Sequence, residues 1–295
     1  MTPAFSPRTR ACTTVHDRVV LITGCSSGIG RHVAGGLRER GYRVFATARR
    51  HDDVERLAAE GLESLQLDVA NSSSIEHALE VLLERTGGRL YGLFNNAGYG
   101  QTGAVEDLYR DVLREQFETN LFGLHELTMR AIPVMRRQGE GRIIHNSSVL
   151  GLVALKYRGA YSASKFALEG LTDALRMELR GSGVHVSLIE PGPVSSAFRK
   201  NARAAFKRNI DVDSSVHREI YAAVERRLSK EGDAAPFTLG PEAVLKKVVH
   251  ALESRRPRAR YYVTTPTCIF GFLKRVLPAA VLDRILLRVS GAENR

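Results

Sequence analysis

Short apolar runs alternate with stretches of helical periodicity over the first two thirds of the chain. The first run, residues 19–23, contains β-branched side chains and leads directly into a group of glycines, which is typical of a strand buried on both faces. Helical spacing then continues to Arg40 and stops at Gly41. The same criteria predict strands at residues 43–48, 65–67, 91–94, 142–146 and 185–189, and helices from about residue 71, from about residue 107 and over residues 160–181.

Strands that alternate with helices indicate βαβ units, which require a parallel sheet and right-handed crossovers. We therefore predict an α/β fold with a doubly wound parallel sheet of the Rossmann type. No internal repeat or low-complexity linker divides the 295 residues, so we expect a single domain. The predicted boundaries are a disordered lead at residues 1–18, the domain at residues 19–265 and a C-terminal helical extension at residues 266–295.

A glycine-rich turn links the first predicted strand to the first predicted helix. In this turn Gly24 permits a sharp bend, Gly28 lets the backbone approach a pyrophosphate, and Gly30 lets the helix pack on the strand. The amino end of the helix offers free N–H groups and partial positive charge to phosphates. Glycines also make plain loops, but this position between a strand and a helix favours dinucleotide binding.

The end of the second predicted strand indicates which dinucleotide is bound. An acidic residue there would hold the ribose 2′-hydroxyl of NAD, but the chain has Ala48-Arg49-Arg50, with Arg49 placed 19 residues beyond Gly30. A guanidinium matches the planar geometry of a phosphate, and the hydroxyls of Ser26 and Ser27 can add donors. The alternative is a pair of solvated surface arginines; the missing acid favours NADP(H).

The net charge of +11 is concentrated at the end of the chain. Residues 1–197 hold 23 basic and 22 acidic side chains, whereas residues 198–295 hold 20 basic and 10 acidic ones. Such an excess indicates an anionic partner, which leaves cofactor phosphates, anionic lipid and nucleic acid as candidates. The sequence has no zinc-finger, helix-turn-helix or stacking-aromatic pattern, so we expect no contact with nucleic acid.

Composition and cysteine spacing predict a cytoplasmic protein. Hydrophobic residues make up 43% and charged residues 25% of the chain, as in ordinary soluble globular proteins. Cys12, Cys25 and Cys268 have neither disulfide nor metal-ligand spacing, which indicates reduced thiols and no metal site. Residues 1–18 lack the apolar run that secretion requires.

Candidate chemistry comes from Tyr161 and Lys165, which are four residues apart and therefore share one face of the predicted helix. A free tyrosine has a pKa near ~10, which is poorly matched to proton transfer at neutral pH. A neighbouring ammonium favours the phenolate and lowers that pKa. Many helices carry such a pair, so its meaning depends on the surrounding motifs.

Several motifs accompany the pair in a fixed order along the chain. They are the glycine turn, Asn95-Asn96-Ala97-Gly98, Asn120, Asn146-Ser147-Ser148, the Tyr161/Lys165 pair and Pro191-Gly192. Together they resemble the short-chain dehydrogenase/reductase family over residues 19–198. The resemblance implies an oxidoreductase that interconverts a carbonyl and an alcohol.

The resemblance also implies catalytic roles. Tyr161 matches the family's general acid–base residue, and Lys165 is its partner. Ser148, 13 residues before Tyr161, matches the serine that hydrogen-bonds the substrate oxygen, and this spacing excludes the adjacent Ser147. Asn120 is similar to the asparagine that holds a water in the proton relay behind the lysine.

The predicted cofactor site combines the glycine turn with positions that the resemblance supplies. Asp68 and Asn95 match positions on the adenine and ribose side, and Ser196 stands where the family usually has a threonine for the carboxamide. The residues expected to bind NADP(H) are Gly24, Ser26, Ser27, Gly28, Ile29, Gly30, Arg49, Asp68, Val69, Asn95, Ala97, Gly98, Tyr161, Lys165, Pro191, Gly192, Val194 and Ser196.

Family resemblance makes residues 193–238 a lid over the substrate. The expected substrate contacts are Ser148, Leu150, Tyr161 and Phe198. Phe198 and Phe206 either form an apolar wall opposite Leu150, Leu152 and Tyr99, or simply pack the lid. An apolar wall favours lipophilic aldehydes, retinoids or steroids over sugars.

Three motifs, Gly24-Cys-Ser-Ser-Gly-Ile-Gly30, Phe166-Ala-Leu-Glu-Gly170 and Ser187-Leu-Ile-Glu190, look closest to the branch that contains 17β-hydroxysteroid and retinol dehydrogenases. Residues 237–244 and the basic C-terminal stretch are similar to bacterial members that reduce aldehydes with NADPH. We therefore favour reduction of an apolar aldehyde or ketone, and the resemblance implies a homo-oligomer.

The end of the chain exceeds a minimal family member. Leu282, Ile285, Leu286 and Val289 have the spacing of a helix with one apolar side. The uncharged stretch at residues 261–273 has 13 residues, short of the roughly 18 that a spanning helix needs. Two interpretations remain: peripheral contact with an anionic membrane, or packing on the domain or on a second subunit.

The sequence thus predicts an NADP(H)-dependent oxidoreductase acting on small apolar carbonyls or alcohols. One alternative is a dinucleotide-sensing protein that kept the fold and lost the chemistry, although a sensor has no need for Asn120, Ser148, Tyr161 and Lys165. Another is steroid or retinol specificity within the same class.

Overall fold

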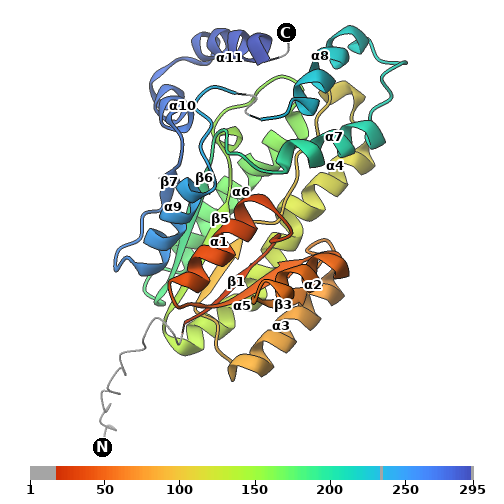
Figure 1. Ribbon diagram of the computed structural model, residues 1–295. Helices are drawn as coiled ribbons and strands as arrows, with labels where there is room; N and C mark the ends of the chain where they lie inside the picture. Colours follow the sequence, from red (N-terminus) through yellow and green to blue (C-terminus); the bar gives the residue numbers. More distant parts are fainter. Residues whose placement is uncertain (1–17, 233–234, 294–295) are drawn as a thin grey trace, which may run out of the picture.

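The computed structural model describes residues 18–232 and 235–293. The predicted disordered lead lies outside the described residues except for Arg18, whose guanidinium lies 4.3 Å from the centre of the Tyr91 ring. Within the described residues, helices cover both sides of one sheet, as Figure 1 shows.

Seven parallel strands build the sheet in the order β3-β2-β1-β4-β5-β6-β7. The strand order reverses between β1 and β4, and ligands of doubly wound sheets bind at the carboxyl ends of the strands around such a point. The predicted fold class is confirmed. The strands are β1 (Val19–Ile22), β2 (Arg43–Ala48), β3 (Glu63–Gln66), β4 (Gly92–Asn95), β5 (Gly141–Asn146), β6 (Val184–Glu190) and β7 (Arg260–Tyr262).

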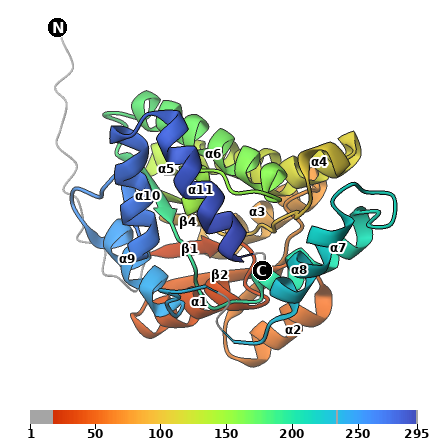
Figure 2. The same ribbon diagram turned by 90° about the horizontal axis from the view of Figure 1, so that it is seen from above.

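The layers are visible from above in Figure 2, with the sheet between two groups of helices. Apolar side chains of α1 (Gly28–Glu39) and α9 (Glu242–Glu253) pack on one face of the sheet. Those of α3 (Ser72–Thr86) and α5 (Gly123–Gln138) pack on the other face, where α6 (Gly159–Glu178) joins them. Strands β1, β4 and β5 are buried nearly throughout, which accounts for their apolar runs in the sequence.

The predicted helix from about residue 107 is in fact three consecutive segments. It comprises α4 (Arg110–Phe117), a π-helical turn (Glu118–Phe122) and α5. The elements that were not predicted include α2 (His51–Ala59), α9 and β7. Strand β7 has three residues, of which Tyr261 is buried, so it leaves no apolar run for a sequence pattern to detect.

Four helices stand above the carboxyl ends of the strands (Figures 1 and 2). Within the predicted lid, α7 (Phe198–Asn209) and α8 (Arg218–Ser229) share a small apolar cluster of their own. They are followed, after α9 and β7, by α10 (Thr265–Val276) and α11 (Ala279–Glu293). None of the described helices combines the length and apolar composition that a bilayer crossing demands.

Candidate active site

The glycine turn between β1 and α1 has the backbone shape that its three glycines were expected to permit. Gly24 and Gly28 have left-handed φ angles of +70° and +59°, which side chains rarely tolerate. A Cβ on Gly30 would lie 2.4 Å from the carbonyl oxygen of Gly24 and 2.5 Å from Nδ2 of Asn96. The turn is therefore folded tightly against its own helix and against the end of β4.

The amino end of α1 is open for an anion. Its N-cap residue, Ser27, makes no side-chain cap hydrogen bond, and no acidic residue occupies the first turn. The first N–H groups of a helix lack partners within it and carry partial positive charge. A pyrophosphate therefore fits this terminus.

Cys25 lies inside the turn and fills buried space there. Its thiol is fully buried and donates to the carbonyl oxygen of Ile22 at 3.3 Å. Burial raises the pKa of the Cys25 thiol to about 12, so the reactive thiolate is not formed at neutral pH.

The end of β2 presents Arg49 to solvent. Its guanidinium makes no ion pair with any described residue, and its carbonyl oxygen accepts a hydrogen bond from Gln66 at 3.0 Å. Arg50, in contrast, is paired with Asp52 at 3.0 Å. A third arginine, Arg56, lies nearby and donates to the carbonyl oxygen of Ser26 at 2.8 Å. Because Arg56 is also paired with Asp53 at 2.6 Å, Arg49 carries the positive charge at this edge that has no ion-pair partner among the described residues.

The ends of β3 and β4 bring the remaining predicted adenine-side positions to this edge. Asp68 accepts from the N–H of Ala70 at 3.0 Å, and Val69 is buried. Asn95 is 2% exposed; its Nδ2 donates to Thr128 at 2.9 Å, while its Oδ1 lacks a partner among the described residues. A buried acceptor without a donor is costly, and a bound ligand could supply that donor.

Two residues of this region were missed as site residues by the sequence reasoning. Thr23 Oγ1 accepts from the N–H groups of Asn96 and Ala97, each at 2.9 Å. The Asn96 amide donates to the carbonyl oxygens of Thr23 at 2.9 Å and Gly24 at 3.1 Å. These bonds fix the end of β4 to the glycine turn, and the Asn95–Gly98 motif was the signal that could have revealed them.

One face of α6 is hydrogen-bonded to the end of β5, turn by turn. The Tyr161 phenol faces Ser148, whose hydroxyl lowers the pKa of that phenol. One turn further on, Lys165 Nζ donates to the carbonyl oxygen of Asn146 at 2.7 Å and lies 5.7 Å from the centre of the Tyr161 ring. The structure therefore brings together the three predicted catalytic groups Ser148, Tyr161 and Lys165.

The same face of α6 contacts Ser147 and Ser148 through different residues. Ser147 donates to the carboxylate of Glu169, four residues beyond Lys165. Ser148 instead turns toward Tyr161, and its hydroxyl also accepts from the N–H of Leu150 at 3.1 Å. The two serines therefore have different partners, and only Ser148 faces Tyr161.

Burial controls the protonation of both titratable groups. It raises the pKa of the Tyr161 phenol to about 12, and the hydrogen bond from Ser148 and the charge of Arg158 offset this only in part. It also lowers the pKa of Lys165 to about 8. The pattern of neighbouring charges had led us to expect a lowered tyrosine pKa; in the described chain burial outweighs that attraction.

Asn120 lies in the π-helical turn and is fully buried. Its Nδ2 donates to the carbonyl oxygen of Tyr99 at 2.9 Å and to Ser164 Oγ at 3.2 Å, and its Oδ1 accepts from the N–H of Tyr99 at 3.1 Å. π-Helical turns are rare and often occur at functional sites. The side chain thus connects the turn to α6 at the residue next to Lys165.

The segment after β6 closes the site from the other side. Pro191 accepts from the N–H of Val149 at 2.8 Å, and a Cβ on Gly192 would lie 2.2 Å from Oγ1 of Thr264. A Cβ on Gly28 would lie 3.0 Å from the Cβ of Ser196. Val194 pairs with Leu239 in an isolated bridge. Ser196 therefore meets the glycine turn, and Pro191 meets the segment that follows Ser148.

The structure distinguishes the two lid aromatics. Phe198 is 38% exposed and its ring packs edge-on against Tyr161, with 5.2 Å between centroids. Phe206 is 1% exposed and packs against Tyr221 in the lid's own cluster. Leu150 and Leu152 are buried. Of the two alternatives, packing of the lid therefore holds for Phe206, whereas Phe198 lies against Tyr161.

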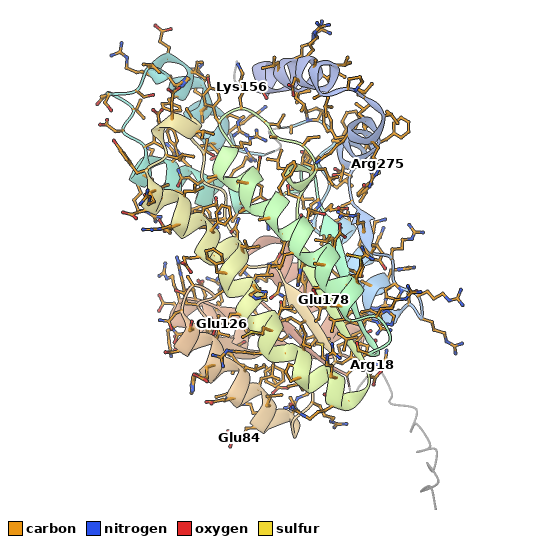
Figure 3. The ribbon with its side chains drawn as sticks, turned by 180° about the vertical axis from the view of Figure 1, so that it is seen from behind. Arg18, Glu84, Glu126, Lys156, Glu178 and Arg275 are labelled. Atoms are coloured by element: carbon orange, nitrogen blue, oxygen red, sulfur yellow. The ribbon has the colours of Figure 1, made fainter. Side chains whose placement is uncertain are left out.

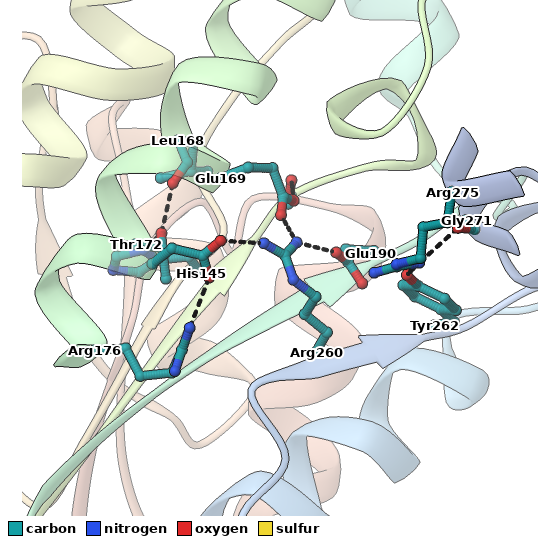
Figure 4. A network of polar contacts seen from close by, with 12 residues as sticks. His145, Leu168, Glu169, Thr172, Arg176, Glu190, Arg260, Tyr262, Gly271 and Arg275 are labelled. Atoms are coloured by element: carbon teal, nitrogen blue, oxygen red, sulfur yellow. Dashed lines mark hydrogen bonds and ion pairs between the residues drawn. The ribbon is translucent and has the colours of Figure 1, made fainter. Parts of the chain in front are cut away.

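A partly buried ionic network lies behind the site and was not predicted (Figure 4). Arg260 of β7 bonds to Glu190 at 2.8 Å, to Asp173 at 2.6 Å and to Glu169. Because Glu169 also holds Ser147, the network ties β7 to the strand end that carries Ser148. Its members lie up to 91 residues apart, so local spacing gave no signal.

Residues 18–207 match the family model for short chain dehydrogenase. The Escherichia coli K12 protein called uncharacterized oxidoreductase YbbO is 46% identical over 272 residues, which cover 92% of this chain and 95% of the relative. Human 17-beta-hydroxysteroid dehydrogenase type 1 is 38% identical over 259 residues, with 83% of this chain and 77% of the relative covered. The crystal structure of a short chain dehydrogenase/reductase from Burkholderia phymatum, in complex with NAD, has a TM-score of 0.74 at 26% identity, covering 90% of this chain and 95% of that chain.

Proposed function

This chain belongs to the short-chain dehydrogenase family, and from that premise we propose that it interconverts a carbonyl and an alcohol with NADP(H), using Tyr161 as general acid–base. The coarser statement, an oxidoreductase with a nicotinamide dinucleotide-binding fold, follows from the family itself. The use of NADP(H) and the acid–base role of Tyr161 are supported by the residues of the site.

The observation that carries the proposal is the contact between Tyr161 and Ser148 with Lys165 one helical turn away. Two hydroxyls that meet at the carboxyl edge of a parallel sheet can both donate to one substrate oxygen. A buried ammonium beside them stabilises negative charge in a medium of low dielectric. A purely structural cluster would not need all three groups.

The glycine turn and α1 fit a dinucleotide, and we assign Gly24, Ser26, Ser27, Gly28, Ile29 and Gly30 to its pyrophosphate. Two observations support this assignment: the amino end of α1 has no side-chain cap, and the buried Oδ1 of Asn95 has no hydrogen-bond donor among the described residues. Arg49, which makes no ion pair within the described chain, supports a 2′-phosphate and hence NADP(H) over NAD(H). Asp68, Val69, Ala97 and Gly98 are assigned to the adenine and ribose side, and Pro191, Gly192, Val194 and Ser196 to the nicotinamide.

When bound, the cofactor supplies the hydride that reaches the carbonyl carbon. Negative charge then grows on the carbonyl oxygen, where Ser148 and Tyr161 donate hydrogen bonds. Tyr161 gives its proton to that oxygen, and Lys165 holds positive charge beside the resulting phenolate. With a pKa of about 12, the Tyr161 phenol keeps its proton at neutral pH, as a proton donor to the carbonyl oxygen requires.

The apolar surroundings favour a lipophilic carbonyl. Phe198 lies against Tyr161, and Leu150 follows Ser148 by two residues and is buried. We propose apolar aldehydes or ketones as substrates. A steroid is the second candidate, favoured by the similarity to human 17-beta-hydroxysteroid dehydrogenase type 1.

The test is NADPH oxidation with aliphatic and aromatic aldehydes, ketosteroids, retinal and sugars, run in parallel with NADH. We expect turnover of an apolar carbonyl with NADPH, and a fall of about 100- to 10,000-fold in kcat for Tyr161→Phe with cofactor affinity retained. Tyr157→Phe, in a nearby tyrosine outside the cluster, is the matched control. Tight NADPH binding without any turnover would instead support a non-catalytic sensor.

A further inference from the structure

We propose that the outer face of α10 and α11 is a docking surface for an anionic lipid bilayer. It lies beside the carboxyl ends of the strands, so a docked molecule would turn its active-site side toward the membrane. The consequence for substrate capture rests on the proposed function; the docking itself does not.

The first observation is an apolar stripe on α10 that the protein leaves uncovered. Ile269, Phe272 and Val276 follow one another at intervals of three and four residues, so they share one helix face. They are 48%, 63% and 53% exposed. Buried contacts of α10 are made instead by Thr267 and Gly271. The described chain therefore holds α10 by its small-residue face and leaves the large apolar side chains outside.

Helix α11, unlike α10, packs a large apolar side chain on the domain. Leu286 and Ser290 are 9% and 2% exposed, and Ser290 accepts a hydrogen bond from the N–H of Lys156 at 3.2 Å. The apolar side predicted from the sequence therefore packs on the domain. Figure 3 shows Lys156 at the end of the molecule that α11 crosses.

The outer side of α11 continues the apolar stripe and adds charge. Val281 and Leu287 are exposed, as are Arg284 and Arg288. Neither arginine forms an ion pair with a described residue. Apolar side chains accompanied by exposed cations are the signature of a helix that lies in a bilayer interface.

Charge decides between the candidate occupants of this surface. Residues 265–291 hold four basic side chains, Lys274, Arg275, Arg284 and Arg288, and one acidic side chain, Asp283. Arg275 bonds to Tyr262 and Lys274 lies over the Phe166 ring, whereas Arg284 and Arg288 have no ion-pair partner among the described residues. A symmetric contact would bring two surfaces of net positive charge together, whereas an anionic leaflet attracts these cations. The complementary partner is therefore anionic lipid.

The position of the surface suggests its use. α11 crosses the face above the carboxyl ends of the strands (Figure 2), and Lys156 lies five residues before Tyr161. An apolar carbonyl concentrates in a bilayer rather than in water. A molecule docked by α10 and α11 would thus take its substrate at the membrane surface.

The experiment is co-sedimentation of the full chain with vesicles of phosphatidylcholine alone and of an equal mixture of phosphatidylcholine and phosphatidylglycerol. We expect binding to the mixed vesicles, weakened by salt. Arg284→Gln with Arg288→Gln should lower the partition coefficient by about 30-fold, and Phe272→Ser by about tenfold. None of these residues belongs to the proposed catalytic or cofactor site.

Matched controls distinguish binding through this surface from non-specific effects of exposed charge and exposed apolar side chains. Arg136→Gln with Arg137→Gln removes two exposed charges from α5, and Met177→Ser removes an apolar side chain that is 64% exposed on α6. Neither control should change binding. The proposal is overturned if the mixed vesicles do not bind the chain, if the control pair loses as much affinity as the test pair, or if Phe272→Ser changes the molecular mass by light scattering and leaves vesicle binding intact, which would assign the surface to a second copy.

The readout is independent of the proposed function. NADPH-dependent reduction of a water-soluble aldehyde without vesicles should be equal in the parent, Phe272→Ser and the arginine pair. A chain that binds vesicles but reduces no carbonyl would refute the proposed function and leave the docking surface in place. A chain that reduces a carbonyl but binds no vesicles would refute the docking surface alone.

Discussion

The ring of Phe198 meets the ring of Tyr161 edge-on, with 5.2 Å between centroids and 61° between planes. The contact depends on Gly100, where a Cβ would lie 2.7 Å from the tip of the Phe198 ring. Phe198 is the first residue of α7, so the lid reaches the proposed general acid through the first side chain of this helix.

Phe198→Ala should therefore weaken the binding of apolar substrates without removing the proton donor. We expect KM for an apolar aldehyde to rise by about tenfold, which corresponds to ~1.4 kcal/mol of lost aromatic contact. Steady-state kinetics over a series of aldehyde chain lengths would measure it. Phe237→Ala, in another exposed lid aromatic, is the control, and an unchanged KM in Phe198→Ala would remove Phe198 from the substrate site.

Phe206→Ala should act on stability instead. Phe206 is buried against Tyr221 in the lid cluster, and removing a buried phenylalanine side chain typically lowers the free energy of unfolding by ~3–5 kcal/mol. Urea denaturation would measure it, with Val216→Ala, at an 85% exposed lid position, as the control. A stable variant with a raised KM would restore Phe206 to the apolar wall.

The sequence was informative where structure depends on neighbouring residues. Buried parallel strands leave apolar runs, so β1, β2, β4, β5 and β6 were predicted close to their observed bounds. A three-residue strand such as β7 leaves no such run. The π-helical turn around Asn120 was also invisible, because it interrupts hydrogen bonding rather than the apolar periodicity.

The site was predictable in its residue types and not in its energetics. Fixed spacing distinguished Ser148 from Ser147, and the fold places them on different partners. The pKa of Tyr161 was not predictable, since burial depends on segments far away in the sequence. The same holds for Arg260 and Glu169, which meet only after β7 has joined the sheet.

Arg49→Asp should reverse the cofactor preference. The substitution removes the guanidinium proposed to hold the 2′-phosphate and offers a carboxylate to a ribose 2′-hydroxyl. We expect the ratio of kcat/KM for NADPH to that for NADH to fall by about 100-fold, as for loss of a charge-assisted bidentate contact. Arg50→Asp, at a residue already paired with Asp52, is the control; equal preference in the parent and in Arg49→Asp would argue against the assignment.

Carbonyl reduction should decline on the alkaline side of neutrality. Burial lowers the pKa of Lys165 to about 8, so the ammonium is present at pH 7 and is lost as the pH rises through that value. The phenol of Tyr161, with a pKa of about 12, stays protonated over the same pH range. The pH profile of kcat/KM should therefore fall with one limb near about 8, and a profile that stays flat to about 10, the ordinary range of lysine, would contradict the lowered value.

Glu190→Gln should stabilise the protein at alkaline pH. Glu190 is fully buried, one of its carboxylate oxygens has no partner among the described residues, and burial raises its pKa to about 8. A group whose pKa is raised on folding contributes stability that is complete below its unfolded pKa and is lost as the pH rises through the folded value. Between about 4.5 and about 8 the parent therefore loses stability that the glutamine variant, which cannot ionise, retains.

Thermal unfolding of both proteins from about pH 5 to about pH 8 would show the Tm of Glu190→Gln gaining on that of the parent as the pH rises. Asp173→Asn is the matched control, because Asp173 bonds to the same guanidinium of Arg260 but is partly exposed to solvent. If Glu190→Gln instead loses stability toward pH 8, the 2.8 Å ion pair with Arg260 outweighs the cost of burying the carboxylate. Arg260 would then stabilise Glu190 in its charged form, and the network would join β6 to β7 as a true salt bridge rather than as a neutral hydrogen bond.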